Sequence, residues 1–131
     1  MKTPTWLALG LTVVCFIVAG AAMSCAREGK IINVDFSWSG KQVEMSVGDS
    51  LTITLPSDTG TGYSWSSWVS DEIILQLSED KYIGQVGTGG KEIWTFKALT
   101  EGTCTIEMEY RPPQEEDATP AQTFNLTVNI Q

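Results

Sequence analysis

The side chains that most enzymes use for acid–base and nucleophilic chemistry are scarce in this sequence. It contains no His among its 131 residues, which excludes His-dependent catalytic triads, His-ligated zinc and imidazole acid–base catalysis. A pair of carboxylates is the remaining option, but Asp58, Glu92 and Glu109 have no spacing that separates them from surface charges. The sequence therefore indicates a protein that is not an enzyme.

Charge and loop composition exclude several classes of ligand. The formal net charge of −8 provides no electrostatic footprint for a phosphate backbone, so we expect no nucleic-acid partner. Asp71-Glu72 and residues 115–117 lack the alternating oxygen ligands of a calcium loop. The glycines within residues 87–90 are not followed by the Gly-Lys-Ser/Thr of a phosphate-binding loop. We therefore expect no metal and no cofactor.

The cysteines have different expected roles. Cys15 lies inside an apolar amino-terminal run and Cys25 follows its end, which leaves Cys104 without a disulfide partner in the rest of the chain. Cys104 alternates in phase with Ile106 and Met108, so its thiol is expected on the apolar face of a strand. We interpret it as a core thiol and not as a nucleophile, because the sequence offers no His to activate it.

The amino terminus has the pattern of an export signal. Lys2 precedes an apolar run at residues 6–23, whose last part is rich in small residues and leads into Ser24 and Cys25. This order is typical of a lipoprotein-type signal peptide, in which the Cys after the cleavage point carries the lipid. The positive charge of Lys2 before the run, the apolar run itself and the small residues at its end together predict export from the cytoplasm.

On this interpretation the chain divides into a signal peptide at residues 1–24, a tether at 25–30 and a domain at 31–131. With a lipid on Cys25 the protein is an extracytoplasmic, membrane-anchored lipoprotein of the cell envelope. Cleavage without lipidation would make it a secreted protein. An uncleaved anchor also remains open, because a helical run of this length spans about 27 Å, close to the bilayer core of about 30 Å.

Short alternating segments fill the domain, and no helical periodicity is convincing there. Gly, Pro, Asp and Ser separate the segments, and a polar, glycine-rich loop is expected at residues 56–62. Seven or eight strands predict an all-β fold, an immunoglobulin-like β-sandwich, with a barrel as the structural alternative. We expect the Trp residues mainly in its core. The expected strand regions are 32–38, 43–45, 51–55, 63–68, 73–82, 92–98, 103–110 and 124–130.

Three stretches differ from ordinary hairpin connections. They read LPSDTGTGYSW at residues 55–65, VGTGGKEIW at 86–94 and YRPPQEED at 110–117. Together and in this order they resemble the chagasin-like inhibitors of papain-type cysteine peptidases, whose loops read approximately NPTTGYxW, GxGGxxxW and RPW. The resemblance extends over residues 43–130. No single motif is specific, but three in order on a domain of matching length form a joint signal.

The resemblance implies that all three loops lie at one end of the sandwich. The first loop would enter the cleft of a papain-like cysteine peptidase and the other two would embrace its walls, in a reversible, non-covalent complex. It also implies a monomer without a cofactor. Carried over by position, the expected peptidase-binding residues are Asp58, Thr59, Gly60, Thr61, Gly62, Tyr63, Gly87, Thr88, Gly89, Gly90, Trp94, Arg111, Pro112 and Pro113.

The residue types suggest distinct roles inside these loops. Gly60 and Gly62 lack a β-carbon, so their backbone can approach a narrow groove or adopt positive φ. The Thr61 hydroxyl can face the cleft or bond its own backbone. Tyr63 is more naturally a support of its loop than a contact with a partner, and Trp94 is expected in the core or as a support of the second loop.

The loops also depart from the family pattern. Asp58-Thr59 replaces the usual Asn-Pro and Pro113 replaces the usual Trp of the third loop, which removes a candidate aromatic anchor. Trp65 or Trp68 would compensate only if they reach the same end. These changes keep a second function open, a non-inhibitory extracytoplasmic binding module of the same fold.

Overall fold

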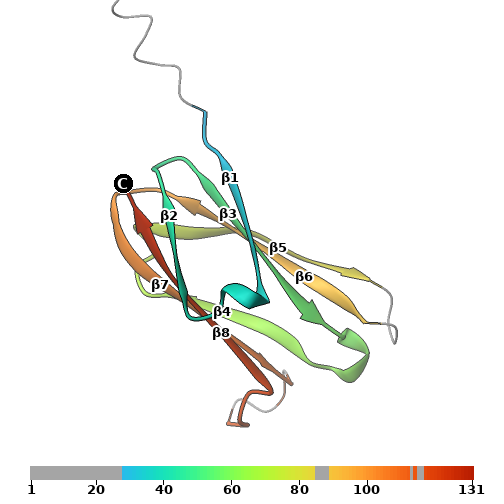
Figure 1. Cartoon of the computed structure of the whole chain (residues 1–131). Coiled ribbons are helices and arrows are strands. Elements are labelled where there is room, and N and C mark those ends of the chain that lie inside the picture. The colour runs from blue at the N-terminus through green and yellow to red at the C-terminus, as the bar shows by residue number, and fades with distance from the viewer. Residues whose placement is uncertain (1–27, 85–88, 113, 115–116) are drawn as a thin grey trace, which may run out of the picture.

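A computed structural model of the chain describes residues 28–84, 89–112, 114 and 117–131. Its strands form two four-stranded sheets packed face to face (Figure 1). The prediction of an all-β sandwich is confirmed, and the barrel is excluded because the strands pair into two separate sheets. One sheet has the order β1 (Ile31–Asp35), β3 (Ser50–Ser57), β6 (Gly90–Ala98) and β5 (Leu75–Gly84), and the other has the order β2 (Lys41–Met45), β8 (Gln122–Ile130), β7 (Gly102–Arg111) and β4 (Ser64–Val69).

Antiparallel pairing dominates the middle of both sheets. β3 pairs with β6, β6 with β5, β8 with β7 and β7 with β4, all antiparallel. At one side of the sandwich the outer strands are parallel to their neighbours, β1 to β3 and β2 to β8. The connection from β4 to β5 crosses between the sheets at the other side.

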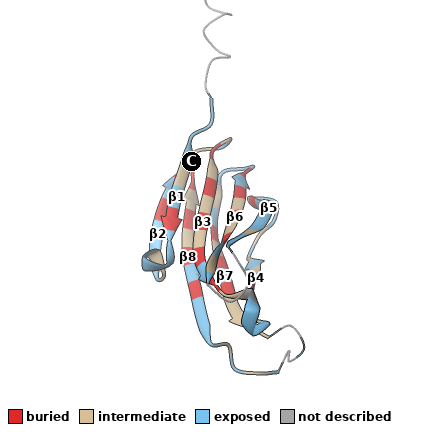
Figure 2. Ribbon diagram, turned by 90° about the vertical axis from the view of Figure 1, so that its right-hand side faces the viewer, coloured by how far each residue is buried: buried red, intermediate tan, exposed pale blue. Residues whose placement is uncertain are grey.

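The core lies where the inward faces of the two sheets meet, and its residues follow the alternation seen in the sequence. Figure 2 shows buried residues in bands along the strands, with exposed positions between them and toward the strand ends. Trp65 and Trp94 are buried, whereas Trp68 is largely exposed. The buried apolar residues are Val34, Val43, Met45, Leu51, Ile53, Leu55, Trp65, Leu75, Trp94, Phe96, Ala98, Cys104, Ile106, Met108, Phe124, Leu126, Val128 and Ile130.

Cys104 is a member of this core, as predicted. Its thiol is free and only 2% of the residue is exposed. Burial, with a smaller contribution from Asp71, raises the pKa of the thiol above its ordinary value. A thiol that resists ionisation is a poor nucleophile, so Cys104 acts in packing.

The first strand is shorter than its alternating pattern predicts. It ends at Asp35, and a single 3-10 turn, η2 (Phe36–Trp38), follows it. The Asp35 carboxylate accepts hydrogen bonds from the Ser37 hydroxyl and from the Ser37 backbone N–H, and these bonds lower its pKa. This cap ends the strand by giving the backbone a local alternative to sheet pairing, so the apolar side chain of Phe36 is partly exposed.

The strand connections gather at two opposite ends of the sandwich. We call one the base end, formed by the chain entry at residues 28–30 and the turns at 46–49, 70–74 and 99–101. The other is the loop end, where β3, β5 and β7 finish (Figure 1). Among the described residues, no helix has the length and apolar character needed to cross a membrane. The predicted signal peptide and Cys25 lie outside the described residues.

Backbone hydrogen bonds join the segments of the base end. Gly48 N–H donates to the Ala98 carbonyl at 2.9 Å and Leu99 N–H to the Ile74 carbonyl at 2.8 Å. The buried carboxylate of Asp49 accepts from the N–H of Lys30 at 2.9 Å. The last residue of the expected tether is therefore held against the sandwich.

Candidate functional site

The strand register brings the three unusual loops to one end of the molecule. In one sheet Gly90 pairs with Ser57 and with Gly84, so the first and second loops leave from neighbouring positions. In the other sheet Arg111 pairs with Ser64, the residue that follows the first loop. All three connections thus emerge from the loop end, opposite the chain entry at the base (Figure 1).

A side-chain contact links the two sheets at this end. The Tyr110 hydroxyl, from β7, accepts a hydrogen bond from the Asp58 N–H at 2.9 Å, just beyond β3. Beside this bond lies a shallow depression of about 260 Å³. Its lining comes from the roots of all three loops, namely Pro56, Ser57, Asp58, Gly89, Gly90, Tyr110 and Gln122.

Asp58 organises the first loop from within. Its carboxylate accepts from the Gly60 N–H at 3.0 Å, and its carbonyl accepts from the Thr61 N–H at 3.2 Å and the Thr61 hydroxyl at 2.7 Å. These bonds close the single 3-10 turn η3 (Thr59–Thr61). Asp and Asn side-chain oxygens can both accept such a bond from the backbone, so Asp58, which departs from the family pattern, still caps the turn.

Gly62 and Thr61 show how the tip of this loop is built. Gly62 has φ +82°, and a β-carbon there would meet nothing within 4 Å. Its backbone conformation, rather than lack of space, therefore favours glycine. The Thr61 hydroxyl uses its proton inside the loop, which is the local alternative of the two predicted roles.

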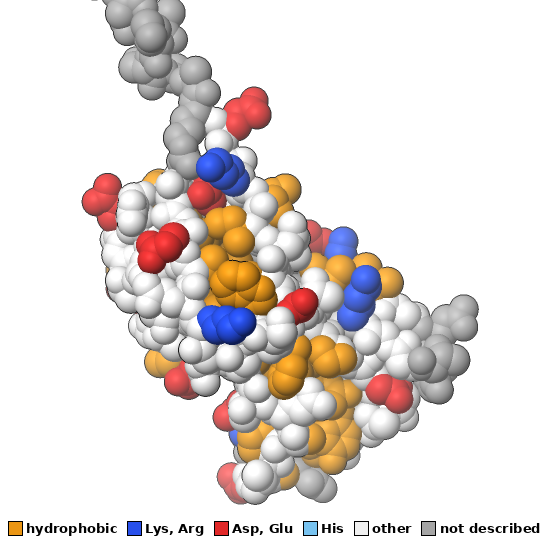
Figure 3. Space-filling view, in the orientation of Figure 1, with side chains coloured by type: hydrophobic (Ala, Val, Ile, Leu, Met, Phe, Trp, Pro, Cys, Tyr) orange, Lys and Arg blue, Asp and Glu red, His pale blue; other side chains and the backbone are white. Residues whose placement is uncertain are grey.

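A chain of aromatic rings supports the loop from below. The Tyr63 ring centroid lies 5.5 Å from that of Tyr110, which lies 5.2 Å from that of Trp65. Phe36 lies 6.3 Å from Trp65, and the Trp65 indole N–H donates to the Pro56 carbonyl at 2.9 Å. Hydrophobic side chains also gather toward the lower end of the face in Figure 3. Tyr63 thus braces the loop.

The second loop is described only at its carboxyl-terminal side, because Gly87 and Thr88 lie outside the described residues. Gly89 has φ +79°. A β-carbon at Gly90 would lie 2.6 Å from the Tyr82 hydroxyl, so packing within the protein already requires a glycine there. Trp94 is 6% exposed and belongs to the core. This placement agrees with the prediction of a core residue, and it leaves Trp94 little surface to offer a partner.

The third loop begins at Arg111, the last residue of β7. The guanidinium donates to the carboxylate of Glu109 on the same strand and forms an ion pair with it. Pro112 is partly buried and Pro113 lies outside the described residues. Glu109 therefore already restrains the Arg111 side chain.

The two Trp residues of β4 do not replace the missing third-loop Trp. Trp65 is 4% exposed, so it lies beneath the loops. Trp68 is 58% exposed, but it pairs with Glu107 and lies farther from the loop end than the Ser64–Arg111 pair. Neither side chain reaches the tip of the loop end.

Glu92 and Ser57 take part in this site, although sequence reasoning did not select them. Glu92 is 8% exposed, and its carboxylate accepts from the Ser57 hydroxyl at 2.6 Å and the Trp65 N–H at 3.1 Å. The sequence did contain a sign of this burial, because Glu92 lies at the same alternate positions of the strand as the buried Trp94 and Phe96. An acid in phase with a core face is expected to have a buried polar partner.

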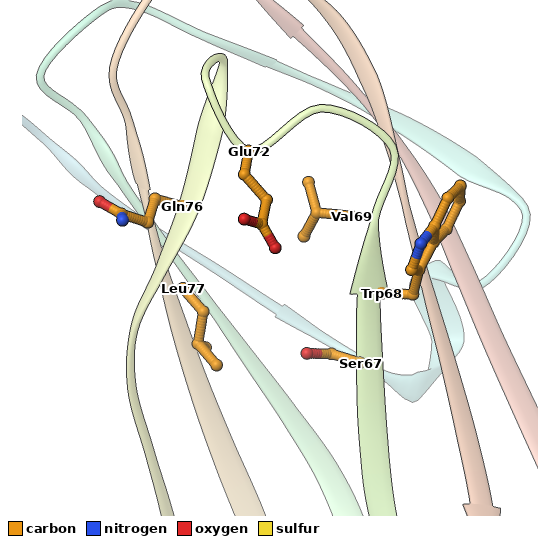
Figure 4. A pocket seen from close by; sticks show the side chains of 6 residues that line it. All are labelled: Ser67, Trp68, Val69, Glu72, Gln76 and Leu77. Atoms are coloured by element: carbon orange, nitrogen blue, oxygen red, sulfur yellow. The ribbon is translucent and has the colours of Figure 1, made fainter.

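Metal binding and acid–base chemistry are the other roles considered for the described part of the chain. No group of His, Cys, Asp and Glu within the described ranges is arranged to hold a metal ion. A second hollow lies between the edge strands β4 and β5 (Figure 4). It contains a single carboxylate, Glu72, beside Leu77 and Trp68, which is no acid–base constellation.

Together, these observations define a β-sandwich that gathers the roots of three loops at one end. The sequence model described as "Chagasin family peptidase inhibitor I42" matches residues 44–128. The chain belongs to the chagasin family of peptidase inhibitors, whose members are inhibitors and not enzymes. No curated protein gives a significant match to the chain.

Solved structures share the fold. The cysteine protease inhibitor EhICP2 from Entamoeba histolytica has a TM-score of 0.72 and 23% identity, covering 81% of this chain and 100% of its own. Amebosin has a TM-score of 0.64 and 26% identity, covering 79% and 100%. PbICP-C, solved in complex with falcipain-2, has a TM-score of 0.56 and 17% identity, covering 81% and 93%.

Proposed function

We propose that this protein is a reversible, non-covalent inhibitor of papain-like cysteine peptidases, acting as a monomer through its loop end. The observation that carries the proposal is the strand register, which makes three loops of a chagasin-family chain neighbours at one end. The complex of PbICP-C with falcipain-2 supports the class of partner, because PbICP-C shares this fold.

The first loop is the element that enters the cleft. Gly60 and Gly62 expose backbone without a side chain, which suits close approach to a narrow groove. Asp58 and Thr61 hold the turn together before any partner arrives, and an ordered loop loses less conformational entropy on binding. Inhibition then results from occupation of the cleft and needs no reaction with the peptidase.

The second and third loops contact the walls of the cleft. Their roots flank the first loop, at Gly90 in one sheet and Arg111 in the other. With a formal net charge of −8, the protein favours a peptidase whose cleft is surrounded by basic residues, because opposite potentials speed association.

The third loop favours a competing function, a binding module of the same fold that does not inhibit. Pro113 stands where the chagasin-like loop pattern has Trp, and loss of an aromatic anchor weakens binding about 30- to 1000-fold when the anchor is a hot spot. The two functions differ in whether the protein blocks substrate turnover.

The inhibitor and the non-inhibitory binding module can be distinguished by titrating the full chain in detergent into papain and into an unrelated serine peptidase. Selective inhibition of papain, relieved by dilution, is the expected result. Recovery of intact inhibitor after the titration would exclude slow cleavage as the cause. A chain that leaves papain and other papain-like peptidases fully active would contradict the proposal.

We also propose that the protein is an extracytoplasmic lipoprotein anchored through Cys25. The chain entry at the base end supports this, because an anchor there leaves the loop end free. In cells given a labelled fatty acid, the wild-type chain should acquire label and Cys25→Ala should not. Equal labelling of both would contradict the lipid attachment.

A further inference from the structure

Glu92 is one of the few charged side chains that the described part of the sandwich buries. It lies on the inward face of β6, and its cross-strand neighbours are Leu55 and Tyr82. A buried carboxylate is costly unless hydrogen bonds compensate for lost water. One of its oxygens receives two such bonds, from the Ser57 hydroxyl at 2.6 Å and the Trp65 N–H at 3.1 Å.

The positions of these donors are informative. Ser57 is the last residue of β3 and directly precedes the first loop, whereas Trp65 is the second residue of β4, which follows that loop. Glu92 itself is two residues beyond Gly90, where the second loop rejoins its sheet. A single carboxylate oxygen thus connects both ends of the first loop and the root of the second, across the two sheets.

We propose that Glu92 is a positioning residue for inhibition, one that fixes the spacing and direction of the first loop relative to the second. This inference rests on the proposed function, because the loops act on a peptidase only if that function is correct. The carboxylate is buried beneath the loops and does not contact the partner. Its effect is to order the loops in the free protein, which lowers the entropy lost on binding.

The base end provides a matched control. Asp49 is also buried, at 2% exposure, and its carboxylate accepts from the N–H of Lys30 and of Ser46, both at 2.9 Å. Both carboxylates therefore bridge separate segments of the same sandwich at opposite ends. Replacing either one by its amide removes a buried charge and weakens charge-assisted hydrogen bonds, but only one change lies beneath the loops.

The experiment compares Glu92→Gln and Asp49→Asn in the full chain in detergent, by thermal unfolding and by inhibition of papain. Both variants should unfold at lower temperature than the wild type. Glu92→Gln should raise the inhibition constant about 10-fold, which corresponds to about 1.4 kcal/mol, whereas Asp49→Asn should change it less than about twofold. Equal inhibition constants for the two variants would overturn the positioning role.

Ser57→Ala provides a milder variant that retains the carboxylate and loses one donor. It should raise the inhibition constant about threefold. In the double variant with Glu92→Gln, the inhibition constant should rise by less than the product of the two single fold-changes, because both substitutions break the same hydrogen bond. Fully multiplicative effects would show that the two residues act independently and would contradict the proposal.

Amide hydrogen exchange separates failure of this inference from failure of the proposed function. The Trp65 amide should exchange faster in Glu92→Gln and remain unchanged in Asp49→Asn, whether or not a peptidase is present. If the wild type fails to inhibit, the proposed function is wrong, and the positioning role in inhibition is wrong with it. If the wild type inhibits but Trp65 exchange is unaffected by Glu92→Gln, only the positioning role is wrong.

Discussion

The two ends of the sandwich differ in the hydrogen bonds that hold them together. At the base end most of these bonds join backbone groups, as between Gly48 and Ala98 and between Leu99 and Ile74, and the Asp49 carboxylate adds bonds from the N–H groups of Lys30 and Ser46. At the loop end, within the described residues, side chains make most of the connections, including the Tyr110 hydroxyl, the Thr61 hydroxyl and the Glu92 carboxylate. A single substitution can therefore alter the loop end while the base retains its bonds.

Two glycines with similar conformations provide the strongest test of this contrast. Gly62 in the first loop and Gly48 at the base have φ +82° and +94°, and both have open space where a β-carbon would lie. Valine at either position should cost about 1–2 kcal/mol of stability through backbone strain. Gly62→Val should also raise the papain inhibition constant about 100-fold or more, because it adds a branched side chain to the inserted loop.

The control Gly48→Val should leave the inhibition constant within about twofold of the wild type. Thermal unfolding and papain titration of both variants measure the two effects separately. A large loss of inhibition in Gly48→Val would show that the ends are coupled.

Tyr110 offers a smaller change with the same purpose. Tyr110→Phe removes the hydroxyl that bonds the Asp58 N–H and leaves the ring to pack on Tyr63 and Trp65. We expect the free energy of unfolding to fall by about 1 kcal/mol and the papain inhibition constant to rise about 5- to 10-fold. Thr100→Val at the base is the comparison, because the Thr100 N–H still bonds the Ile74 carbonyl after its hydroxyl is lost.

Thr100→Val should leave inhibition unchanged and cost less stability than Tyr110→Phe. If the two variants inhibited papain equally well, the side-chain bonds of the loop end would have no role in binding.

A substitution in the core between the two ends, at Cys104, should change the free energy of unfolding and leave papain inhibition unchanged. Burial raises the pKa of the Cys104 thiol. The contribution of this thiol to the free energy of unfolding is therefore fully present below its unfolded pKa of about 8.5, and it is lost as pH rises through the folded pKa. Above about pH 8.5, the unfolding free energy of the wild type should therefore fall more steeply than that of Cys104→Ala. Urea titrations of both proteins from pH 7 to 10 measure this difference, and parallel curves would contradict it.

Trp68 should show the smallest effect. Because it is 58% exposed and lies on β4 away from the loop tips, Trp68→Ser should change stability by no more than about 0.5 kcal/mol. Its inhibition constant should stay within about twofold of the wild type. A marked loss of papain inhibition would place the contact surface on the side of the sandwich and not at its end.

The strands were predictable because their burial repeats every second residue. The segments Thr103–Tyr110 and Phe124–Ile130 lie within observed β7 and β8, since strict alternation has no other simple explanation in a short segment. The prediction failed at residues 36–38, where the alternation continues but the Asp35 cap ends the strand. A local side-chain bond overrode the pattern there.

The loops could be located from their glycines and prolines, but not the residues that hold them. Glu92 was classed with surface charges because sequence does not show that Ser57 and Trp65 converge on it. Those donors are separated from it by 35 and 27 positions in the chain. Only the pairing of β3 with β6 and the packing of the second sheet bring them together.

The parallel pairing of β1 has a mechanical consequence. Its register with β3 extends from Ile31 opposite Ser50 to Asp35 opposite Thr54, and the chain enters it at the base. A force that pulls the amino-terminal segment away from the loop end acts along the strand and loads these bonds in shear. Many bonds then share the tension, instead of opening one after another.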